Sequence, residues 1–378
     1  MVTDDWALAK DVVHLNHGSY GGCPRAVLAA AAGWRARLEA APMRFMVLDW
    51  QAELDRARAA LAAFVRAPDD RLVFMPNATN AVATALAAAR IEPGDDLLTT
   101  DHAYRACRNQ LDRLAAARGA RVVVAELPWP FDPQAAVEAI RRAVTPKTTL
   151  ALLDHITSPT ALVLPLEEIL AVLPGVQVLV DGAHAPGQID LDISALLAKG
   201  VTWYAGNNHK WICAPKATGF LVTTTAIRPL VTSHGASPEY GPPNRLHAEL
   251  DWMGTYDPAA HFAVASAIRT ISDLGGGWPA TRWHNHMLAL ELCDRLGGTP
   301  VAPPASLGAM AAFPVELPAG ETPLSLVHTL LRAGYEVPVV DFFRGPLLRV
   351  SAHLYTEPGD ADALAAKLHA LGVKPRTL

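Results

Sequence analysis

The sequence predicts an α/β protein in which a large, doubly wound and mostly parallel sheet is followed by a smaller C-terminal α+β domain. From about residue 71 to 230, apolar runs of strand length alternate with stretches whose apolar residues recur at helical spacing. Such alternation is typical of parallel sheets covered by helices on both faces. Beyond residue 300 the expected strands are short and broken by proline. A chain of 378 residues, 51% of them hydrophobic, is long enough for two such domains.

The expected elements follow one another in a regular order. Helices are expected at 24–40, after Pro24, and at 51–66. In the alternating region the expected strands are 71–75, 96–99, 121–124, 149–154, 176–180, 201–205 and 219–223. The expected helices between them are 80–89, 104–118, 133–144 and 165–173. We expect a long functional loop at 232–258, a helix pair interrupted by three glycines at 259–295, and a terminal helix near 358–371.

Two strand ends carry the residues that point to a cofactor. Asp181 directly follows the strand expected at 176–180, and Lys210 lies in the loop after 201–205. Ligands of open parallel sheets bind beyond the carboxyl ends of the strands, so we expect both side chains at one edge. An amine and a carboxylate in this arrangement suit pyridoxal phosphate. The lysine would form a Schiff base with the aldehyde, and the aspartate would hold the ring nitrogen protonated.

Each of these residues has an ordinary alternative explanation. An aspartate after a strand often only forms a turn or caps a helix, and a lysine in a loop is usually solvated. Lys210, however, is one of only seven lysines, and it lies between a strand end and the bulky Trp211. A lysine that forms a Schiff base needs a partly desolvated setting, which lowers its pKa from the ordinary value of about 10.4.

Other polar groups are expected at the same edge. Ala78 and Thr79 open an alanine-rich helix, whose N-terminal N–H groups suit a phosphate, although an ordinary helix cap is the alternative. His209 is a second candidate for the phosphate. After the neighbouring strand, an aromatic ring at Tyr104 could stack on the cofactor, unless it is a core residue.

Composition excludes several classes of protein. A formal charge of −5 and a pI near 6.3 give no electrostatic reason to expect nucleic acid. Four dispersed cysteines argue against a zinc ribbon or a disulfide scaffold and fit a reducing cytoplasm. The acidic N-terminus is unlike a signal peptide, and no uncharged apolar stretch reaches the roughly 18 residues of a membrane span. His284 and His286 are an unconvincing metal pair, because positions i and i+2 of a helix do not face each other.

Six stretches together point to a family. They read HLNHGSYG at 14–21, NAT at 77–79, DGAHAPG at 181–187, GNNHKW at 206–211, GTYDP at 254–258 and RVSAHLY at 349–355. In this order they resemble fold-type I pyridoxal-phosphate enzymes of the aminotransferase class V group, and most of all its isopenicillin N epimerase-like branch. The resemblance covers nearly the whole chain. It implies a seven-stranded-type sheet in a large domain at 26–258, a small domain at 259–378 and an N-terminal segment at 1–25 that lines the active site.

The resemblance also implies roles for single residues. Lys210 would be the Schiff-base lysine and proton shuttle, and Arg349 would clamp the substrate carboxylate with a planar pair of donors. The implied cofactor contacts are Asp181, His184, Ala78, Thr79, His209 and either His102 or Tyr104 on the ring. The implied contacts at the substrate entrance are Asn16, His17 and Gly18. Gly254 and Thr255 of a partner subunit would complete the phosphate site, which requires a homodimer.

Two positions depart from the family pattern. The family usually has arginine at the position of Tyr256, so a positive charge near the site is missing and the substrate preference is open. The family also often has asparagine where this chain has Thr356. Both changes indicate a specialised member.

The sequence leaves the reaction open. The leading hypothesis is deprotonation at Cα by Lys210 and β-elimination from an S-substituted cysteine, which describes a C–S lyase of specialised metabolism such as antibiotic or thiol biosynthesis. Epimerase, aminotransferase and decarboxylating oxidative deaminase remain alternatives; an epimerase needs a donor on the opposite face, for which Tyr104 or His17 could serve. A cysteine desulfurase needs a nucleophilic cysteine on a loop of its C-terminal domain. That activity is not favoured here, because no cysteine follows Cys293. A non-catalytic binding protein of the same fold is the alternative of another class, against which Asp181, Lys210 and Arg349 argue.

Overall fold

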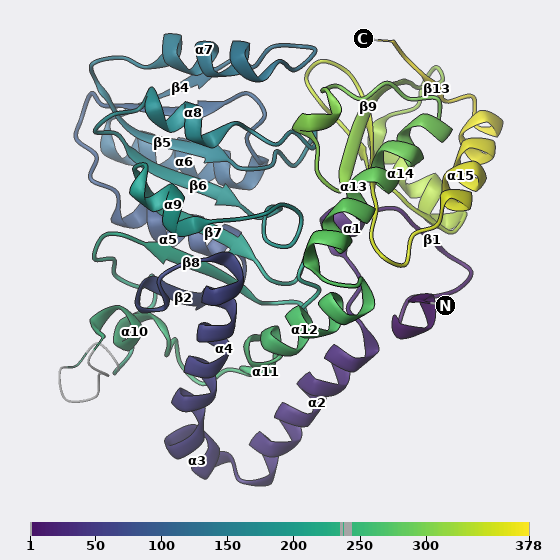
Figure 1. The fold of residues 1–378 in the computed structure, drawn as a ribbon. Coiled ribbons are helices and arrows are strands. Elements are labelled where there is room, and N and C mark those ends of the chain that lie inside the picture. The colour runs from purple at the N-terminus through teal and green to yellow at the C-terminus, as the bar shows by residue number, and fades with distance from the viewer. Residues whose placement is uncertain (1, 235–236, 238–243, 378) are drawn as a thin grey trace.

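The computed structural model describes residues 2–234, 237 and 244–377 (Figure 1). Within these residues, seven strands form the main sheet in the order β2-β8-β7-β6-β5-β3-β4. Neighbouring strands from β7 to β4 run parallel, while β8 is antiparallel to both β7 and β2. The predicted doubly wound, mostly parallel sheet is confirmed.

The elements of the sheet lie close to their predicted bounds. The strands are β2 (Leu72–Met75), β3 (Asp96–Thr100), β4 (Arg121–Ala125), β5 (Thr148–Asp154), β6 (Gln177–Gly182), β7 (Val201–Asn207) and β8 (Gly219–Thr223). The helices of this region are α4 (Trp50–Val65), α5 (Ala78–Ala88), α6 (Arg105–Arg118), α7 (Pro133–Ala143), α8 (Leu166–Ala171), α9 (Ile193–Ala198) and α10 (Arg245–Leu250). Helices α9 and α10, of six residues each, were not predicted, although the equally short α8 was predicted within 165–173. The expectation of a loop throughout 232–258 is wrong at α10, and residues 235–236 and 238–243 lie outside the described part.

Apart from the partly exposed edge strand β4, the strands are largely buried because both faces of the sheet are covered. Val178 and Val180 of β6 face one hydrophobic core, which includes α7, α8 and α9, whereas Leu179 between them faces the other core with α5 and α6. This alternation is the two-residue period of a strand, and it explains why the strands read as continuous apolar runs.

The C-terminal region forms a second, smaller sheet. Strands β9 (Met310–Glu316), β11 (Val339–Val340), β12 (Leu347–Ser351) and β13 (Lys374–Pro375) are antiparallel in the order β11-β12-β9-β13. Its helices are α13 (Trp278–Arg295), α14 (Pro323–Arg332) and α15 (Pro358–Ala370). The predicted α+β character is confirmed. No helix in the described residues is long and apolar enough to cross a membrane.

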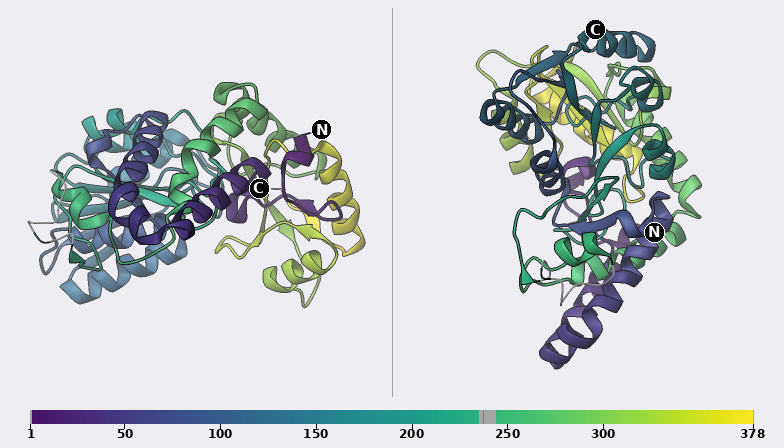
Figure 2. Two further views of the ribbon diagram at one scale, coloured as in Figure 1. Left: turned by 90° about the horizontal axis from the view of Figure 1, so that it is seen from below. Right: turned by 90° about the vertical axis from the view of Figure 1, so that its left-hand side faces the viewer.

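The N-terminal segment connects the two regions. Strand β1 (Val13–His14) pairs with β10 (Tyr335–Glu336) of the C-terminal region, and the short α1 (His17–Tyr20) follows. Helices α2 (Arg25–Ala40) and α4 form an arm that projects from the body, with α3 (Pro42–Arg44) at its tip (Figures 1 and 2). Helices α11 (Ala259–Phe262) and α12 (Val264–Leu274) pack against this arm.

Candidate active site

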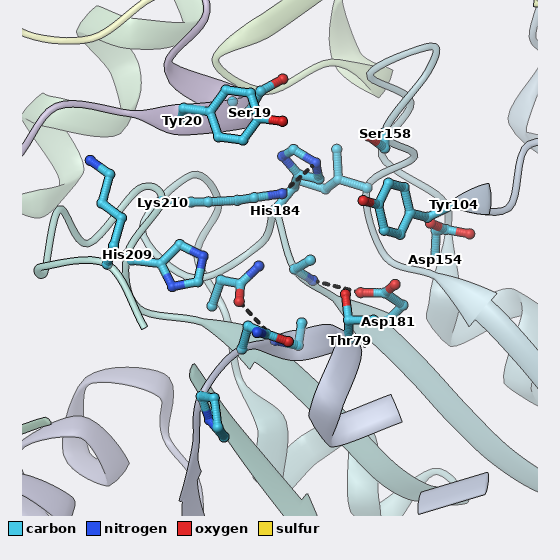
Figure 3. Close-up of a pocket in the computed structure, with 18 of the residues that line it drawn as sticks. Ser19, Tyr20, Thr79, Tyr104, Asp154, Ser158, Asp181, His184, His209 and Lys210 are labelled. Carbon is cyan, nitrogen blue, oxygen red and sulfur yellow. Dashed lines mark hydrogen bonds between the residues drawn. The ribbon is translucent and has the colours of Figure 1, made fainter. Parts of the chain in front are cut away.

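A cavity of about 520 Å³ lies at the carboxyl edge of the main sheet (Figure 3). The ends of β5, β6 and β7, the start of α5 and the short α1 all contribute to its wall. Its polar lining residues are Ser19, Tyr20, Asn77, Thr79, Tyr104, Asp154, Ser158, Asp181, His184, Asn207, His209, Lys210 and Lys216. The predicted meeting of Asp181 and Lys210 at one sheet edge is therefore found, and the cavity has the size of a small-molecule site.

Lys210 lies in the loop after β7 and points into this cavity (Figure 3). Its Nζ is 3.0 Å from Nε2 of His184. Burial and the cation of Arg349 lower the pKa of Lys210 to about 8. Burial also holds the pKa of His184 well below its ordinary value, so that its ring is neutral and accepts a hydrogen bond from the amine. The lysine is thus close to its neutral, nucleophilic form near physiological pH.

We expect the protein without cofactor to capture pyridoxal phosphate at a rate that rises with pH through a midpoint near 8. Only the neutral amine attacks an aldehyde, and burial brings the pKa of Lys210 to about 8. Absorbance after rapid mixing measures the rate at each pH. The variant Arg349→Ala should move the midpoint upward, because the nearby cation that disfavours the ammonium form is gone. A wild-type midpoint near the ordinary lysine value of about 10.4 would contradict the desolvated site.

Asp181 lies within β6 and is 4% exposed. Its Oδ1 accepts a hydrogen bond of 3.0 Å from the N–H of Ala183, and its Oδ2 accepts one of 3.1 Å from the thiol of Cys107. A carboxylate held at both oxygens keeps one orientation, and it faces the cavity that Lys210 also faces (Figure 3). Cys107, on α6, was not predicted, and nothing in the sequence around it indicates this contact.

A second carboxyl group stands beside Asp181. Asp154 ends the neighbouring strand β5 in register with Asp181, lines the same cavity and is 4% exposed. Burial and the charge of Asp181 raise the pKa of Asp154 well above its ordinary value, which favours the neutral acid. Like Asp181, Asp154 lies at the end of a strand of apolar residues, so this residue could have been found from the sequence.

The start of α5 forms one wall of the cavity. Asn77 caps the helix by accepting from the N–H of Asn80, and the N–H of Ala78 donates to Oδ1 of Asn207 at 2.8 Å. The hydroxyl of Thr79 faces the cavity (Figure 3). A Cβ on Gly219 would lie 2.9 Å from Cα of Asn77, so glycine is needed for β8 to approach this turn.

His209 is the other residue that was predicted to hold a phosphate. Its Nδ1 donates to the carbonyl of Thr218 at 2.8 Å, and its ring lines the cavity. Burial and Lys210 lower the pKa of His209 to about 4, so Nε2 is an acceptor in the protein alone. A phosphate dianion nearby would raise that pKa and turn Nε2 into a donor.

Arg349 reaches the cavity wall from β12. It is 2% exposed, and it donates to the carbonyl of Ser158 and, at 2.7 Å, to the hydroxyl of Ser19. It also contacts Oδ1 of Asn16 at 3.4 Å. Since Ser19 and Ser158 line the cavity, the guanidinium stands directly behind its wall. A substrate carboxylate could take over the acceptor places that these side chains occupy.

The structure separates the two candidates for the ring position. Tyr104 lines the cavity, whereas His102 does not. His102 is fully buried, bonds to Thr160 at 2.8 Å through Nδ1 and packs edge-on against Phe342. Of the two rings only that of Tyr104 borders the cavity, and burial raises the pKa of its hydroxyl.

Three other predicted groups lie outside the lining. His17 is 1% exposed and lies behind Lys210 rather than in the cavity, while the neighbouring Gly18 does line it. Asn16 contributes only through Arg349. Gly254 and Thr255 do not line the cavity of their own chain. The sequence could not reveal these directions, because neither loops nor a helix as short as α1 show a period that fixes the side on which a residue lies.

The residues at the cavity fit pyridoxal phosphate. Lys210 supplies an amine of lowered pKa, Asp181 an oriented carboxylate, and Tyr104 an aromatic ring. Nδ1 of His184 is buried and has no hydrogen-bond partner in the described part of the chain, although its ring borders the cavity. An unpaired buried polar atom is costly in the protein alone, so its presence indicates a ligand that reaches it.

Comparisons with known proteins agree with this geometry. The model of the Aminotransferase class-V family matches residues 23–301. The isopenicillin N epimerase of Amycolatopsis lactamdurans is 37% identical over 407 residues, which cover 98% of this chain and 100% of that protein. The L-cysteine desulfhydrase of Arabidopsis thaliana is 27% identical over 364 residues, which cover 88% of this chain and 78% of the relative.

Solved structures share the fold. A cystine C–S lyase, C-DES, in complex with its reaction product cysteine persulfide, superposes with a TM-score of 0.83 at 21% identity. The match covers 96% of this chain and 98% of that one. The apo cysteine desulfurase of Thermococcus onnurineus has a TM-score of 0.79 at 18% identity, covering 98% of this chain and 97% of that one. At these identities the likeness concerns the fold alone.

Proposed function

Because the chain belongs to the aminotransferase class-V family and is a pyridoxal-phosphate enzyme, we propose that it breaks the Cβ–S bond of an S-substituted cysteine by β-elimination. The observation that carries this proposal is the placement of Lys210, a partly buried base at the cavity whose Nζ lies 3.0 Å from His184, with Arg349 behind the cavity wall. β-Elimination needs one base at Cα, whereas epimerisation needs a second group on the opposite face.

The roles of the residues follow from their positions. When bound, pyridoxal phosphate stabilises negative charge at Cα, and Asp181, Tyr104, Thr79 and His209 would hold its ring and phosphate. Arg349 orients the substrate carboxylate, and the neutral amine of Lys210 removes the proton from Cα. The sulfur leaves with the electron pair of the Cβ–S bond and takes up a proton as a thiol. The remaining three-carbon enamine is hydrolysed by water to pyruvate and ammonia.

A nucleophilic cysteine does not belong to this scheme. None of the four cysteines lines the cavity, and all four are buried. Burial raises the pKa of Cys23 and of Cys293 to about 12, which disfavours the thiolate. The structure therefore supports direct release of the thiol rather than sulfur transfer to a protein cysteine. Four free cysteines also fit the proposal of a cytoplasmic enzyme.

Epimerisation is the second candidate. The hydroxyl of Tyr104 faces the cavity and is the remaining candidate for a donor opposite Lys210, since His17 lies outside the lining. The identity of 37% to an isopenicillin N epimerase favours this candidate and a place in antibiotic metabolism. An assay of thiol and pyruvate release from a panel of S-substituted cysteines tests the leading proposal. Failure with every member, together with inversion at Cα of an amino acid, would favour the epimerase.

We expect Arg349→Ala to raise KM for substrates with a free α-carboxylate by roughly 10- to 100-fold. The expected loss of substrate-binding free energy is that of one charge-assisted hydrogen bond, about 1.5–3 kcal/mol. Steady-state kinetics with one substrate measures it. Arg344→Ala is the matched control, because Arg344 lies over the rings of Trp129 and Phe343, away from the cavity lining. Equal KM values in the wild type and in Arg349→Ala would place the carboxylate clamp elsewhere.

We also propose a homodimer in which each cavity is completed by Gly254 and Thr255 of the partner subunit. Thr255 is exposed, and the positive φ of Gly254, 106°, favours glycine in that turn. Met43, Val47 and Leu48 near the tip of the α2–α4 arm are 66–82% exposed, which suits an interface with a second copy.

Mixing two inactive variants tests the shared site. Lys210→Ala lacks the base, and Thr255→Glu would place a negative charge against the cofactor phosphate. In mixed dimers one site carries both changes and the other carries neither, so co-refolding at equal amounts should restore about a quarter of the wild-type activity. Size measurement by light scattering should give a dimer for each variant. Dimers that regain no activity on mixing would contradict a site shared between subunits.

A further inference from the structure

A hydrogen-bonded chain runs through the buried region behind Lys210. His17, on α1, is 1% exposed, and its Nε2 lies 3.1 Å from the carbonyl oxygen of Lys210. Its Nδ1 lies 2.9 Å from the hydroxyl of Tyr355, which belongs to the C-terminal region. Both ring nitrogens of one imidazole are therefore engaged, one of them with the backbone of the catalytic lysine.

The partners fix the position of the ring hydrogen. A carbonyl oxygen only accepts, so Nε2 of His17 must carry a hydrogen and donate it to Lys210. Burial lowers the pKa of His17 to about 3, so the ring is neutral and carries only this one hydrogen. Nδ1 is then an acceptor, and the hydroxyl of Tyr355 must donate to it. The chain has one direction, from Tyr355 through His17 to the carbonyl of Lys210.

The ring of His17 has little freedom to leave this position. The ring of His353 stacks on it with a centroid distance of 4.1 Å, and the ring of Trp211 lies 4.9 Å away. On a third side, a Cβ on Gly21 would lie 2.6 Å from Cε1 and Nε2 of His17. Packing and hydrogen bonding thus specify one orientation of the imidazole.

A metal site is the other arrangement to consider here. His17, Cys213 and His353 place their ligand atoms within 4.8 Å of one another. However, the two imidazole planes are stacked with an interplanar angle of 19°. Ring lone pairs lie in the ring plane, so two nearly parallel rings cannot both direct one at the same ion. Nε2 of His17 is moreover occupied by its hydrogen, which argues for a hydrogen-bonding role.

We propose that His17 is a positioning residue that fixes the backbone of Lys210 through its neutral Nε2–H form, which Tyr355 selects. The same helix α1 carries Ser19, whose hydroxyl accepts from Arg349. One short helix therefore holds both the base and the carboxylate clamp. The inference rests on the proposed role of Lys210 and extends it to a residue that does not touch the cavity.

Two substitutions of similar size separate this role from packing. The amide nitrogen of glutamine can reach the place of Nε2, while that of asparagine reaches only the place of Nδ1. We expect His17→Gln to capture pyridoxal phosphate within about twofold of the wild-type rate and His17→Asn to be about five- to tenfold slower, the effect of one neutral hydrogen bond. In turnover, His17→Asn should lower kcat by a similar factor and leave KM nearly unchanged, because Arg349 keeps its contacts. If both variants are folded by circular dichroism and capture the cofactor equally fast, the proposal is overturned.

Which ring nitrogen of His17 carries the hydrogen can be observed without any reaction. Nitrogen-15 NMR of the protein without cofactor should show His17 with hydrogen on Nε2 across the neutral pH range. Tyr355→Phe should slow cofactor capture by about fivefold, since the ring loses the donor that selects this form. The matched control is Tyr335→Phe, because the hydroxyl of Tyr335 donates to Ala363 away from the chain; its capture rate should equal that of the wild type.

Two results would overturn the inference while leaving the proposed function intact. One is a hydrogen on Nδ1 of His17, which would leave Nε2 with no hydrogen to donate to the carbonyl oxygen of Lys210. The other is stoichiometric zinc in the purified protein that is lost in His17→Asn, which would make the group a metal site. By contrast, cofactor capture by Lys210→Ala would refute the proposed role of the lysine, whatever form His17 has.

Discussion

Lys210→Ala is expected to abolish both covalent capture of pyridoxal phosphate and turnover. Lys210 combines a position beside Asp181 with a pKa lowered to about 8 by burial, so it is the amine prepared to react with the aldehyde. Borohydride fixes the cofactor to the lysine that carries it. Mass spectrometry of a digest should then find the label on the peptide that contains Lys210, and no label should be retained in the variant.

The second lysine of the cavity supplies the control. Lys216 also lines the wall, but it is exposed and its Nζ donates to the carbonyl of Gly21 at 2.5 Å. Lys216→Ala should therefore retain the label on Lys210. A label on Lys216 in the wild type, or full turnover by Lys210→Ala, would show that the reactive amine has been misassigned.

The second large effect is expected when Asp181, the proposed partner of the pyridine nitrogen of pyridoxal phosphate, is replaced. Asp181→Asn should lower kcat by roughly 10²- to 10⁴-fold, since loss of one partner of a buried charge pair costs about 3–5 kcal/mol. An amide keeps the shape and the contact with Ala183 but cannot balance a protonated ring nitrogen. Single-turnover kinetics with saturating cofactor separates this loss from weaker cofactor binding.

Asp154→Asn is the matched comparison for Asp181→Asn. Asp154 is equally buried and in register with Asp181, but its raised pKa favours the neutral acid, which asparagine resembles. Its effect on kcat should be below about tenfold, a difference of less than 1.4 kcal/mol. Equal losses in both variants would mean that the two carboxyl groups share the charge, and the assignment of Asp181 alone would be wrong.

The apolar patterns of the strands predicted most of the fold and the centre of the candidate site. The apolar runs ending at Asp181 and before Lys210 are β6 and β7, and their shared edge follows from the topology of parallel sheets. Helices of eleven residues or more, such as α5, were long enough to show their period. Of the three six-residue helices in this region, α8 was predicted within 165–173 and α9 and α10 were missed.

The directions of side chains in loops and in very short helices could not be predicted. His17, in a matching stretch, and His102, after a strand, were both candidates for the site, yet the structure buries them among aromatic rings rather than in the cavity. Cys107 reaches Asp181 from α6, a contact that depends on how that helix packs on the sheet. Such contacts join residues far apart in the chain, and no local pattern records them.

The surroundings of Tyr256 partly explain why this chain lacks the arginine that the family usually has at this position. Its ring packs edge-on against Trp50 and His261, and burial raises the pKa of its hydroxyl. Nearby, the buried Arg58 bonds to Asp251 at 2.5 Å. A cation at position 256 would stand close to this pair and would need a carboxylate of its own in the interior.

The most direct test of a carbon–sulfur lyase is mass spectrometry of the products formed from an S-substituted cysteine in deuterated water. β-Elimination predicts a free thiol, ammonia and pyruvate that carries deuterium at its methyl group, with Lys210→Ala giving none of them. Unbroken amino acid with deuterium at Cα, and no thiol, would contradict the β-elimination and would assign Lys210 to an epimerase instead.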